Sequence, residues 1–139
     1  MSLNLLIVDD EAEIRNLLAR HFTLLDYTVA TAENGKAAVE ILENSRIDAV
    51  ITDILMPEMD GIGLLGYLRD QLPMVRTIVI TGYITLDNAL ACMRLRAEAF
   101  VFKPIEDLTE LEEAIGQIEK RLKTWQRKLR ELRGMRPEA

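Results

Sequence analysis

Five polar side chains in this 139-residue sequence come at the ends of short apolar runs. Asp9 and Asp10 follow the first run, Asp53 the third, Thr81 the fourth and Lys103 the fifth. Carboxylates that lie together repel one another, so either one has a raised pKa or a cation compensates. Carboxylate oxygens suit Mg²⁺, whereas an ammonium and a hydroxyl suit phosphoryl oxygens. We therefore predict a Mg²⁺ site, with Asp53 as the nucleophile that becomes an aspartyl phosphate.

These side chains meet only if the apolar runs form one parallel sheet. The runs are apolar on both faces, as strands covered on both sides are; they span residues 5–8, 27–30, 47–51, 77–80 and 100–102. Helical patterns lie between them at residues 11–24, 35–44, 61–71 and 85–96, with Asn34 and Thr85 as expected N-caps. Such alternation predicts an α/β fold with a doubly wound parallel sheet, whose strand ends converge on one edge.

The C-terminal segment carries a different pattern. Apolar residues recur at steps of three and four, which is a heptad pattern typical of a long helix with one apolar stripe; they are Leu108, Leu111, Ile115, Ile118, Leu122, Trp125, Leu129 and Leu132. The first half of this helix can cover the sheet. Its second half would extend beyond the domain, because helical residues rise about 1.5 Å each, so its apolar stripe requires a partner.

Charge divides the chain in the same place. Residues 120–139 hold eight Lys or Arg and two acids, a net charge of +6, while residues 1–119 carry −12. An acidic body argues against nucleic-acid binding by that part of the chain. No apolar stretch approaches the length of a membrane span, and the single cysteine excludes a disulfide framework. We expect a cytoplasmic protein without membrane contact.

Four motifs in order resemble the receiver domain of bacterial response regulators. They are LLIVDDE (5–11), DILMPEMDG (53–61), ITGY (80–83) and FVFKP (100–104). The resemblance extends over residues 4 to about 120. It implies a flavodoxin-like five-stranded parallel sheet of order 2-1-3-4-5, followed by an extended C-terminal helix. We expect residues 1–120 to form the receiver domain and residues 121–139 to lead to an output domain or to form a dimer stalk.

The resemblance also implies a role for each site residue. Asp53 would be the phosphoacceptor. Asp10, Asp53 and the backbone carbonyl of Leu55 would bind Mg²⁺, and Asp9 would assist through water. Lys103 would contact the phosphoryl group, and its bond to Pro104 would be cis, which costs an X–Pro bond only about 0.5–1 kcal/mol.

The implied function is a phosphorylation switch rather than an enzyme. A sensor histidine kinase would donate the phosphoryl group, and self-catalysed transfer and slow hydrolysis would be the only chemistry. Thr81 would then move toward the phosphoryl group and Phe100 would rotate into the space it leaves. This change would reshape the face of the fourth helix, fifth strand and fifth helix, through which, together with the C-terminal helix, we expect a homodimer.

Three positions depart from the family pattern or need a separate hypothesis. Arg96 stands seven residues before Lys103, where family members usually carry glycine, so either the fourth helix ends differently or the strain is tolerated. Leu55 and Tyr83 flank the path of attacking water and neither can orient it. We hypothesise that the aspartyl phosphate is long-lived because water is excluded.

Several residues and functions have simpler alternatives. Glu11 can be only an acid favoured by the helix dipole, and Asp60 can be only the cap of the third helix. A degenerate receiver that acts without phosphorylation would need no chemistry at these residues. An aspartate-nucleophile phosphatase of the haloacid-dehalogenase type would place its nucleophile after the first strand, whereas Asp53 follows the third.

Overall fold

The computed structural model describes residues 3–56, 58–82 and 84–135. Its centre is a five-stranded parallel sheet of order β2-β1-β3-β4-β5, which confirms the predicted topology. The strands are β1 (Asn4–Val8), β2 (Thr28–Ala32), β3 (Ala49–Thr52), β4 (Arg76–Thr81) and β5 (Ala99–Phe102). Each lies within two residues of its predicted position. The carboxyl ends of β1, β3, β4 and β5 therefore meet at one edge, as the sequence analysis requires.

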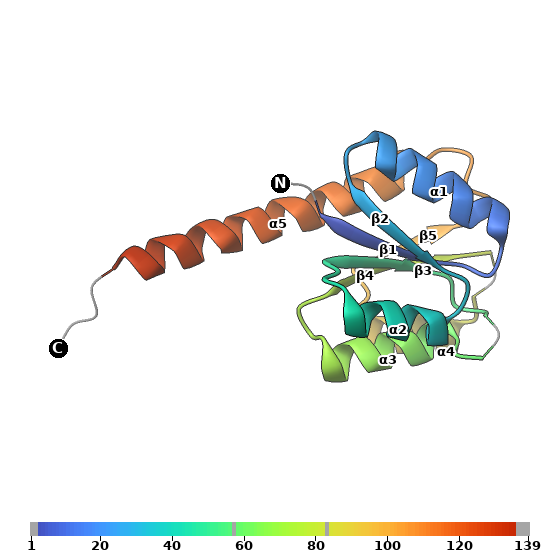
Figure 1. The fold of residues 1–139 in the computed structure, drawn as a ribbon. Helices are drawn as coiled ribbons and strands as arrows, with labels where there is room; N and C mark the ends of the chain where they lie inside the picture. The colour runs from blue at the N-terminus through green and yellow to red at the C-terminus, as the bar shows by residue number, and fades with distance from the viewer. Residues whose placement is uncertain (1–2, 57, 83, 136–139) are drawn as a thin grey trace.

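Helices cover both faces of the sheet (Figure 1). One face packs against α1 (Ala12–Leu24) and α5 (Thr109–Gly134), and the other against α2 (Gly35–Asn44), α3 (Gly61–Gln71) and α4 (Leu86–Arg94). The predicted N-caps are confirmed: Asn34 accepts a hydrogen bond from the Ala37 amide, and Thr85 accepts one from the Asn88 amide. Asp60 caps α3 by accepting from the Gly63 amide.

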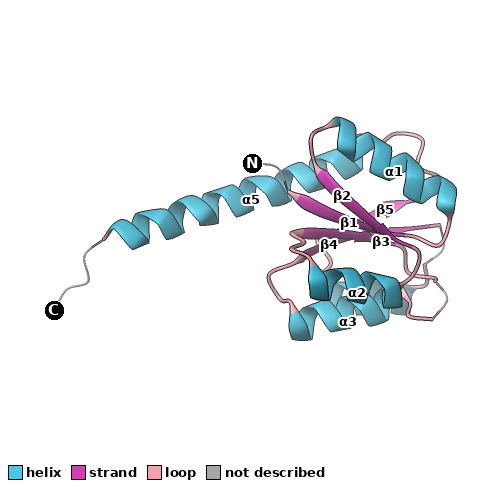
Figure 2. Cartoon of the chain, viewed as in Figure 1, coloured by secondary structure: helices cyan, strands magenta, loops and turns pink. Residues whose placement is uncertain are grey.

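Alternate residues of each strand belong to opposite layers of the core. In β1, Leu5 and Ile7 pack toward α1 and α5, whereas Leu6 and Val8 pack toward α2 and α3. All four side chains are fully buried. Figure 2 shows this helix–sheet–helix arrangement. The residues of the central strands β1, β3 and β4 are buried except for the first residue of β1 and of β4. The layers hold the strand ends, and hence the site, in fixed positions.

α5 is one continuous helix that extends beyond the domain (Figure 1). Leu111, Ile115 and Ile118 are buried against the sheet, as predicted. Trp125 and Leu132 are 61% and 63% exposed. We call residues 123–134 the overhang. Its apolar stripe is largely exposed, although Trp125 and Leu129 line an open cavity beside Ile47 and Met74. Within the described part of the chain, no helix is long and apolar enough to cross a membrane.

α4 ends at Arg94, and Arg96 adopts a left-handed conformation with φ of 67°. The helix thus ends in the usual geometry with a non-glycine residue, and the strain is tolerated. The amides of Arg96 and Ala97 still bond to the carbonyls of Met93 and Cys92, so the last turn of the helix is satisfied.

Candidate functional site

Asp9 lies at the base of the site, directly after β1. Its amide donates to the Ala32 carbonyl, which extends the β1–β2 pairing by one residue. Its side chain is fully buried. Oδ1 accepts a hydrogen bond of 2.8 Å from the Glu11 amide, whereas Oδ2 accepts none from the described residues. One carboxylate oxygen is thereby fixed and the other remains available to a ligand.

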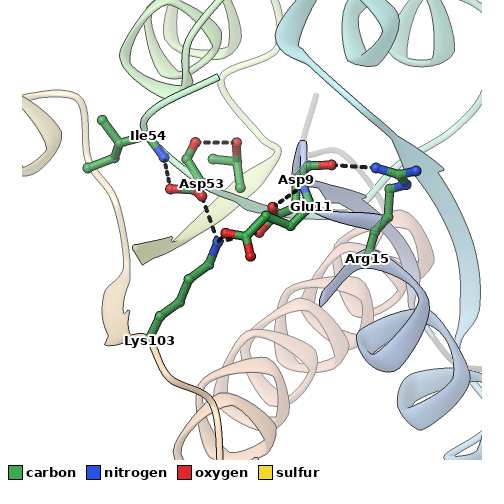
Figure 3. A network of polar contacts seen from close by, with 7 residues as sticks. Asp9, Glu11, Arg15, Asp53, Ile54 and Lys103 are labelled. Carbon is green, nitrogen blue, oxygen red and sulfur yellow. Dashed lines mark hydrogen bonds and ion pairs between the residues drawn. The ribbon is translucent and has the colours of Figure 1, made fainter. Parts of the chain in front are cut away.

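Asp53 follows β3 and lies beside Asp9. Its amide donates to the Val8 carbonyl, and the Thr52 hydroxyl donates to its own carbonyl at 2.8 Å. The side chain is 8% exposed. Oδ1 accepts from the Ile54 amide at 2.6 Å and Oδ2 accepts from Lys103 Nζ at 2.8 Å (Figure 3). Both the backbone and the carboxylate of Asp53 are therefore held in place.

Gly61 allows the loop after β3 to close against Asp53. Its amide donates to the Ile54 carbonyl at 2.8 Å. A Cβ atom at this position would lie 2.1 Å from the carbonyl oxygen of Asp53, closer than any real contact. Glycine is required here because the backbones of Gly61 and Asp53 touch. The DG pair of the sequence motif thus caps α3 and also positions the candidate nucleophile.

Lys103, directly after β5, joins three carboxylates. Nζ lies 2.8 Å from Glu11 Oε1, 2.8 Å from Asp53 Oδ2 and 3.0 Å from Asp9 Oδ2, the last outside hydrogen-bond geometry. Burial by itself lowers the pKa of an ammonium, but hydrogen bonds to Asp53 and Glu11 outweigh it and raise the pKa of Lys103. Lys103 is therefore a permanent cation at neutral pH. Its bond to Pro104 is cis, as expected.

One lysine does not balance the acids of the site. Carboxylate oxygens of four residues, Asp9, Asp10, Glu11 and Asp53, lie within 4.8 Å of one another. Burial raises the pKa of the Asp9 carboxyl above its ordinary value, although the Glu11 amide and the Lys103 charge lower it. The excess negative charge, with Asp9 Oδ2 paired among the described residues only to the Lys103 ammonium at 3.0 Å, fits a divalent cation with oxygen ligands, such as Mg²⁺. The residues present therefore suit the predicted metal.

The site opens to solvent through a cavity of about 240 Å³. It contains five of the predicted residues together with two others; the lining residues are Asp10, Glu11, Asp53, Leu55, Thr81, Gly82 and Lys103. Asp9 lies beneath them. Thr81, at the end of β4, is 1% exposed. The cavity thus joins two exposed acids to the buried Asp53 carboxylate, which suits a small charged group entering from solvent.

Two contacts of the site were not predicted from the sequence, and the prediction for one further residue is not tested by the structure. Glu11 was read as an early-helix acid, but its side chain also binds Lys103. Arg15 was not singled out, yet its guanidinium reaches the Asp9 carbonyl. The sequence signal for Glu11 was its place directly after two acids of the site. Tyr83, part of the water-exclusion hypothesis, lies outside the described residues.

Phe100 does not line the cavity. It is half-buried in β5 and packs against a cluster on the α4 side of the sheet that includes Ile54, Val79 and Cys92. Its β4 partner in the ladder is Val79, and Thr81 pairs with Phe102. The predicted switch pair therefore occupies adjacent strands at different levels, with Thr81 at the site and Phe100 further along the sheet.

Comparisons with known proteins agree with this geometry. The family model described as response regulator receiver domain matches residues 5–116. A probable transcriptional regulator, ycf27, of Cyanidium caldarium is 37% identical over 127 residues, which are 91% of this chain and 50% of that protein. The chain thus spans about half the length of this curated relative.

Two solved structures share both sequence and fold with the chain. The receiver domain of AraT from Geobacillus stearothermophilus is 34% identical with a TM-score of 0.80, covering 91% of this chain and 99% of that one. The response regulator TrrA from Thermotoga maritima, solved in complex with Mg²⁺ and BeF, is 31% identical with a TM-score of 0.75, covering 85% and 99%. These matches do not favour a phosphatase. By its matched motifs, its strand order and the acids gathered at its strand ends, this chain belongs to the response-regulator receiver domain family.

Proposed function

We propose that this receiver domain accepts a phosphoryl group on the carboxylate of Asp53. The observation that carries the proposal is the fixed, nearly buried carboxylate, with Oδ1 held by the Ile54 amide and Oδ2 by Lys103. In the reaction a carboxylate oxygen forms a bond to phosphorus while the bond from phosphorus to a phosphohistidine nitrogen breaks. A sensor histidine kinase is the proposed donor, in the cytoplasm.

The other site residues serve the transferred group. Lys103 would exchange its contact with Asp53 Oδ2 for a phosphoryl oxygen and thereby offset its charge. The Thr81 hydroxyl, on a buried residue that lines the same cavity, would donate to another phosphoryl oxygen. Glu11 holds Lys103 from the solvent side and keeps the ammonium near the cavity. No further substrate is needed, so the chemistry is limited to transfer onto Asp53 and slow hydrolysis.

We propose that Asp10, Asp53 and the Leu55 carbonyl bind Mg²⁺ and that Asp9 assists through water. When bound, Mg²⁺ would neutralise acidic charge and draw electron density from a phosphoryl oxygen. The exposed Asp10 carboxylate and the four acids whose oxygens lie within 4.8 Å of one another support this assignment. Further support comes from the TrrA relative, which was solved in complex with Mg²⁺ and BeF.

Phosphorylation would act at a distance through Thr81 and Phe100. The phosphoryl group would draw the Thr81 hydroxyl inward, and Phe100 would rotate toward the space that Thr81 leaves. The half-buried packing of Phe100 beside α4 supports such a rotation, because the ring has no polar group to desolvate. The altered face of α4, β5 and α5 would then control an output domain or partner.

The overhang of α5 has its own proposed role as the connection from the receiver domain to an output domain and as a dimer stalk. Trp125, Leu129 and Leu132 are each more than half exposed and lie on one stripe. Burying them against a second copy would remove apolar surface from water at about 25 cal/mol per Å². Seven Lys and Arg residues lie among the described residues from 120 onward, so two stalks also repel each other.

The proposal is tested by incubating the protein with acetyl phosphate and Mg²⁺ and measuring intact mass. We expect one added phosphoryl group per chain, lost in the Asp53→Asn variant and in the presence of a metal chelator. Asp70→Asn, on the exposed C-terminal end of α3, is the matched control and should be phosphorylated normally. An unmodified wild-type protein would instead favour a receiver that acts without phosphorylation.

A further inference from the structure

Arg15 makes a contact that the proposed function does not use. It lies in α1, four residues after Glu11, and its Nη1 donates a hydrogen bond of 2.8 Å to the backbone carbonyl of Asp9. Figure 3 shows Arg15 approaching Asp9 from one side while Lys103 approaches from the other. Within the described part of the chain, Arg15 has no carboxylate partner, although the protein carries a net charge of −6.

The position of Arg15 is unfavourable for a cation in other respects. The N-terminal end of a helix carries a partial positive charge, so a cation near it is destabilising. The first turn of α1 has only Glu13 as an acid. A hydrogen bond from a charged donor to a carbonyl is stronger than one between neutral groups. The bond to Asp9 therefore accounts for an arginine at this place.

The Asp9 carbonyl belongs to the peptide that joins Asp9 to Asp10. Fixing this carbonyl fixes the plane of the peptide and so the direction in which the chain leaves β1. The Glu11 amide, one peptide further on, donates to Asp9 Oδ1 at 2.8 Å. Arg15 and the Glu11 amide thus hold the main chain and the side chain of Asp9 separately. Together they leave Asp9 Oδ2 facing Lys103 and Asp53.

We propose that Arg15 is a positioning residue for the metal site, which sets the loop carrying Asp9, Asp10 and Glu11 through the Asp9 carbonyl. It would touch neither the phosphoryl group nor Mg²⁺. This inference rests on the proposed Mg²⁺ binding at these acids. Partners that orient metal ligands without binding the metal typically contribute 10- to 100-fold to metal affinity.

The test compares Arg15→Met with Arg20→Met, which removes an exposed arginine from the same helix and changes net charge equally. Titration of Mg²⁺ by calorimetry should show a dissociation constant about tenfold higher in Arg15→Met and unchanged in Arg20→Met. Arg15→Lys, which keeps a donor, should recover part of the loss.

A second measurement needs no metal. In the metal-free protein, hydrogen exchange of the Glu11 amide should be faster in Arg15→Met than in wild type, while exchange in the β3 core stays close to wild type. Equal Mg²⁺ affinity and equal Glu11 exchange in Arg15→Met and wild type would overturn the inference. A wild-type protein that binds no Mg²⁺ would instead reject the metal site itself, and faster Glu11 exchange would still assign Arg15 to the loop.

Discussion

At the scale of single residues, the candidate nucleophile is held mainly by backbone contacts, and Gly61 provides the most demanding of them. We predict that Gly61→Ala lowers the free energy of unfolding by about 1–3 kcal/mol and abolishes phosphorylation. The reason is that the new Cβ would meet the Asp53 carbonyl at 2.1 Å and only backbone could give way. Chemical denaturation and intact mass measure both effects.

Gly66, five residues along the same helix, is the control for that substitution. A Cβ there meets nothing within 4 Å, so Gly66→Ala should raise the free energy of unfolding by about 1 kcal/mol through helix propensity alone and leave phosphorylation intact. If the two alanine variants behaved alike, close approach to Asp53 would not explain Gly61.

Leu55 also acts at the residue scale, through the lifetime of the phosphoryl group. Its side chain lines the cavity above Asp53 and offers no group that could orient water. We predict that Leu55→Asn shortens the lifetime of phospho-Asp53 by about 10-fold, since positioned general acid–base and hydrogen-bonding groups contribute about 10²–10⁴-fold. The lifetime is measured as the loss of the added phosphoryl mass after acetyl phosphate is removed. Equal lifetimes in the two proteins would contradict exclusion of water at this position.

At the scale of elements, the end of α4 stores local strain. Arg96 has φ of 67°, which glycine adopts without the steric penalty of a side chain. We predict that Arg96→Gly raises the free energy of unfolding by about 0.5–1 kcal/mol, measured by urea denaturation. Asp26→Gly, at φ of 69°, is the comparison and should gain less, because aspartate tolerates this region better than arginine. Destabilisation by Arg96→Gly would mean that the guanidinium, not the backbone, matters there.

The elements themselves were largely predictable, because each leaves a local signal. Runs buried on both faces marked the strands, and Asn34, Asp60 and Thr85 marked helix starts through side chains that accept amide protons. Strand ends were less certain: β3 begins at Ala49 rather than residue 47, since its pairing with β1 begins at Leu5 and Ala49. Ladder ends depend on the neighbouring strand, which local pattern does not encode.

The site was predictable where strand ends alone fixed it. Asp9, Asp53 and Lys103 directly follow strands and Thr81 is the last residue of β4, so their meeting required only the topology. The contacts of Glu11 and Arg15 depend instead on the path of the loop after β1 and on side-chain direction. Spacing along the chain does not determine either. Contacts made by the residues around the strand ends, such as those of Glu11 and Arg15, are therefore the part of the site that could not be predicted from the sequence.

At the scale of the whole molecule, charge and apolar surface are segregated along α5. The receiver body is acidic, whereas residues 120–139 carry a net charge of +6. The same helix buries Ile115 and Ile118 in the domain and exposes Trp125 and Leu129 beyond it. The N-terminal half of the helix is therefore packed into the domain, and its C-terminal half exposes an apolar surface. Between two such helices the apolar stripes attract and the basic side chains repel. Ionic strength changes only the repulsion between the basic side chains.

Self-association of the full chain should consequently strengthen with salt, because screening weakens repulsion between basic stalks while apolar burial persists. Sedimentation velocity at low and high ionic strength measures this. Leu129→Glu combined with Leu132→Glu should abolish association, since both side chains are exposed on the stripe. Lys123→Glu changes net charge by the same two units elsewhere on the exposed helix and should preserve or strengthen association. A wild-type chain that stays monomeric at all salt concentrations would reject the dimer stalk and assign the stripe to a partner of another kind.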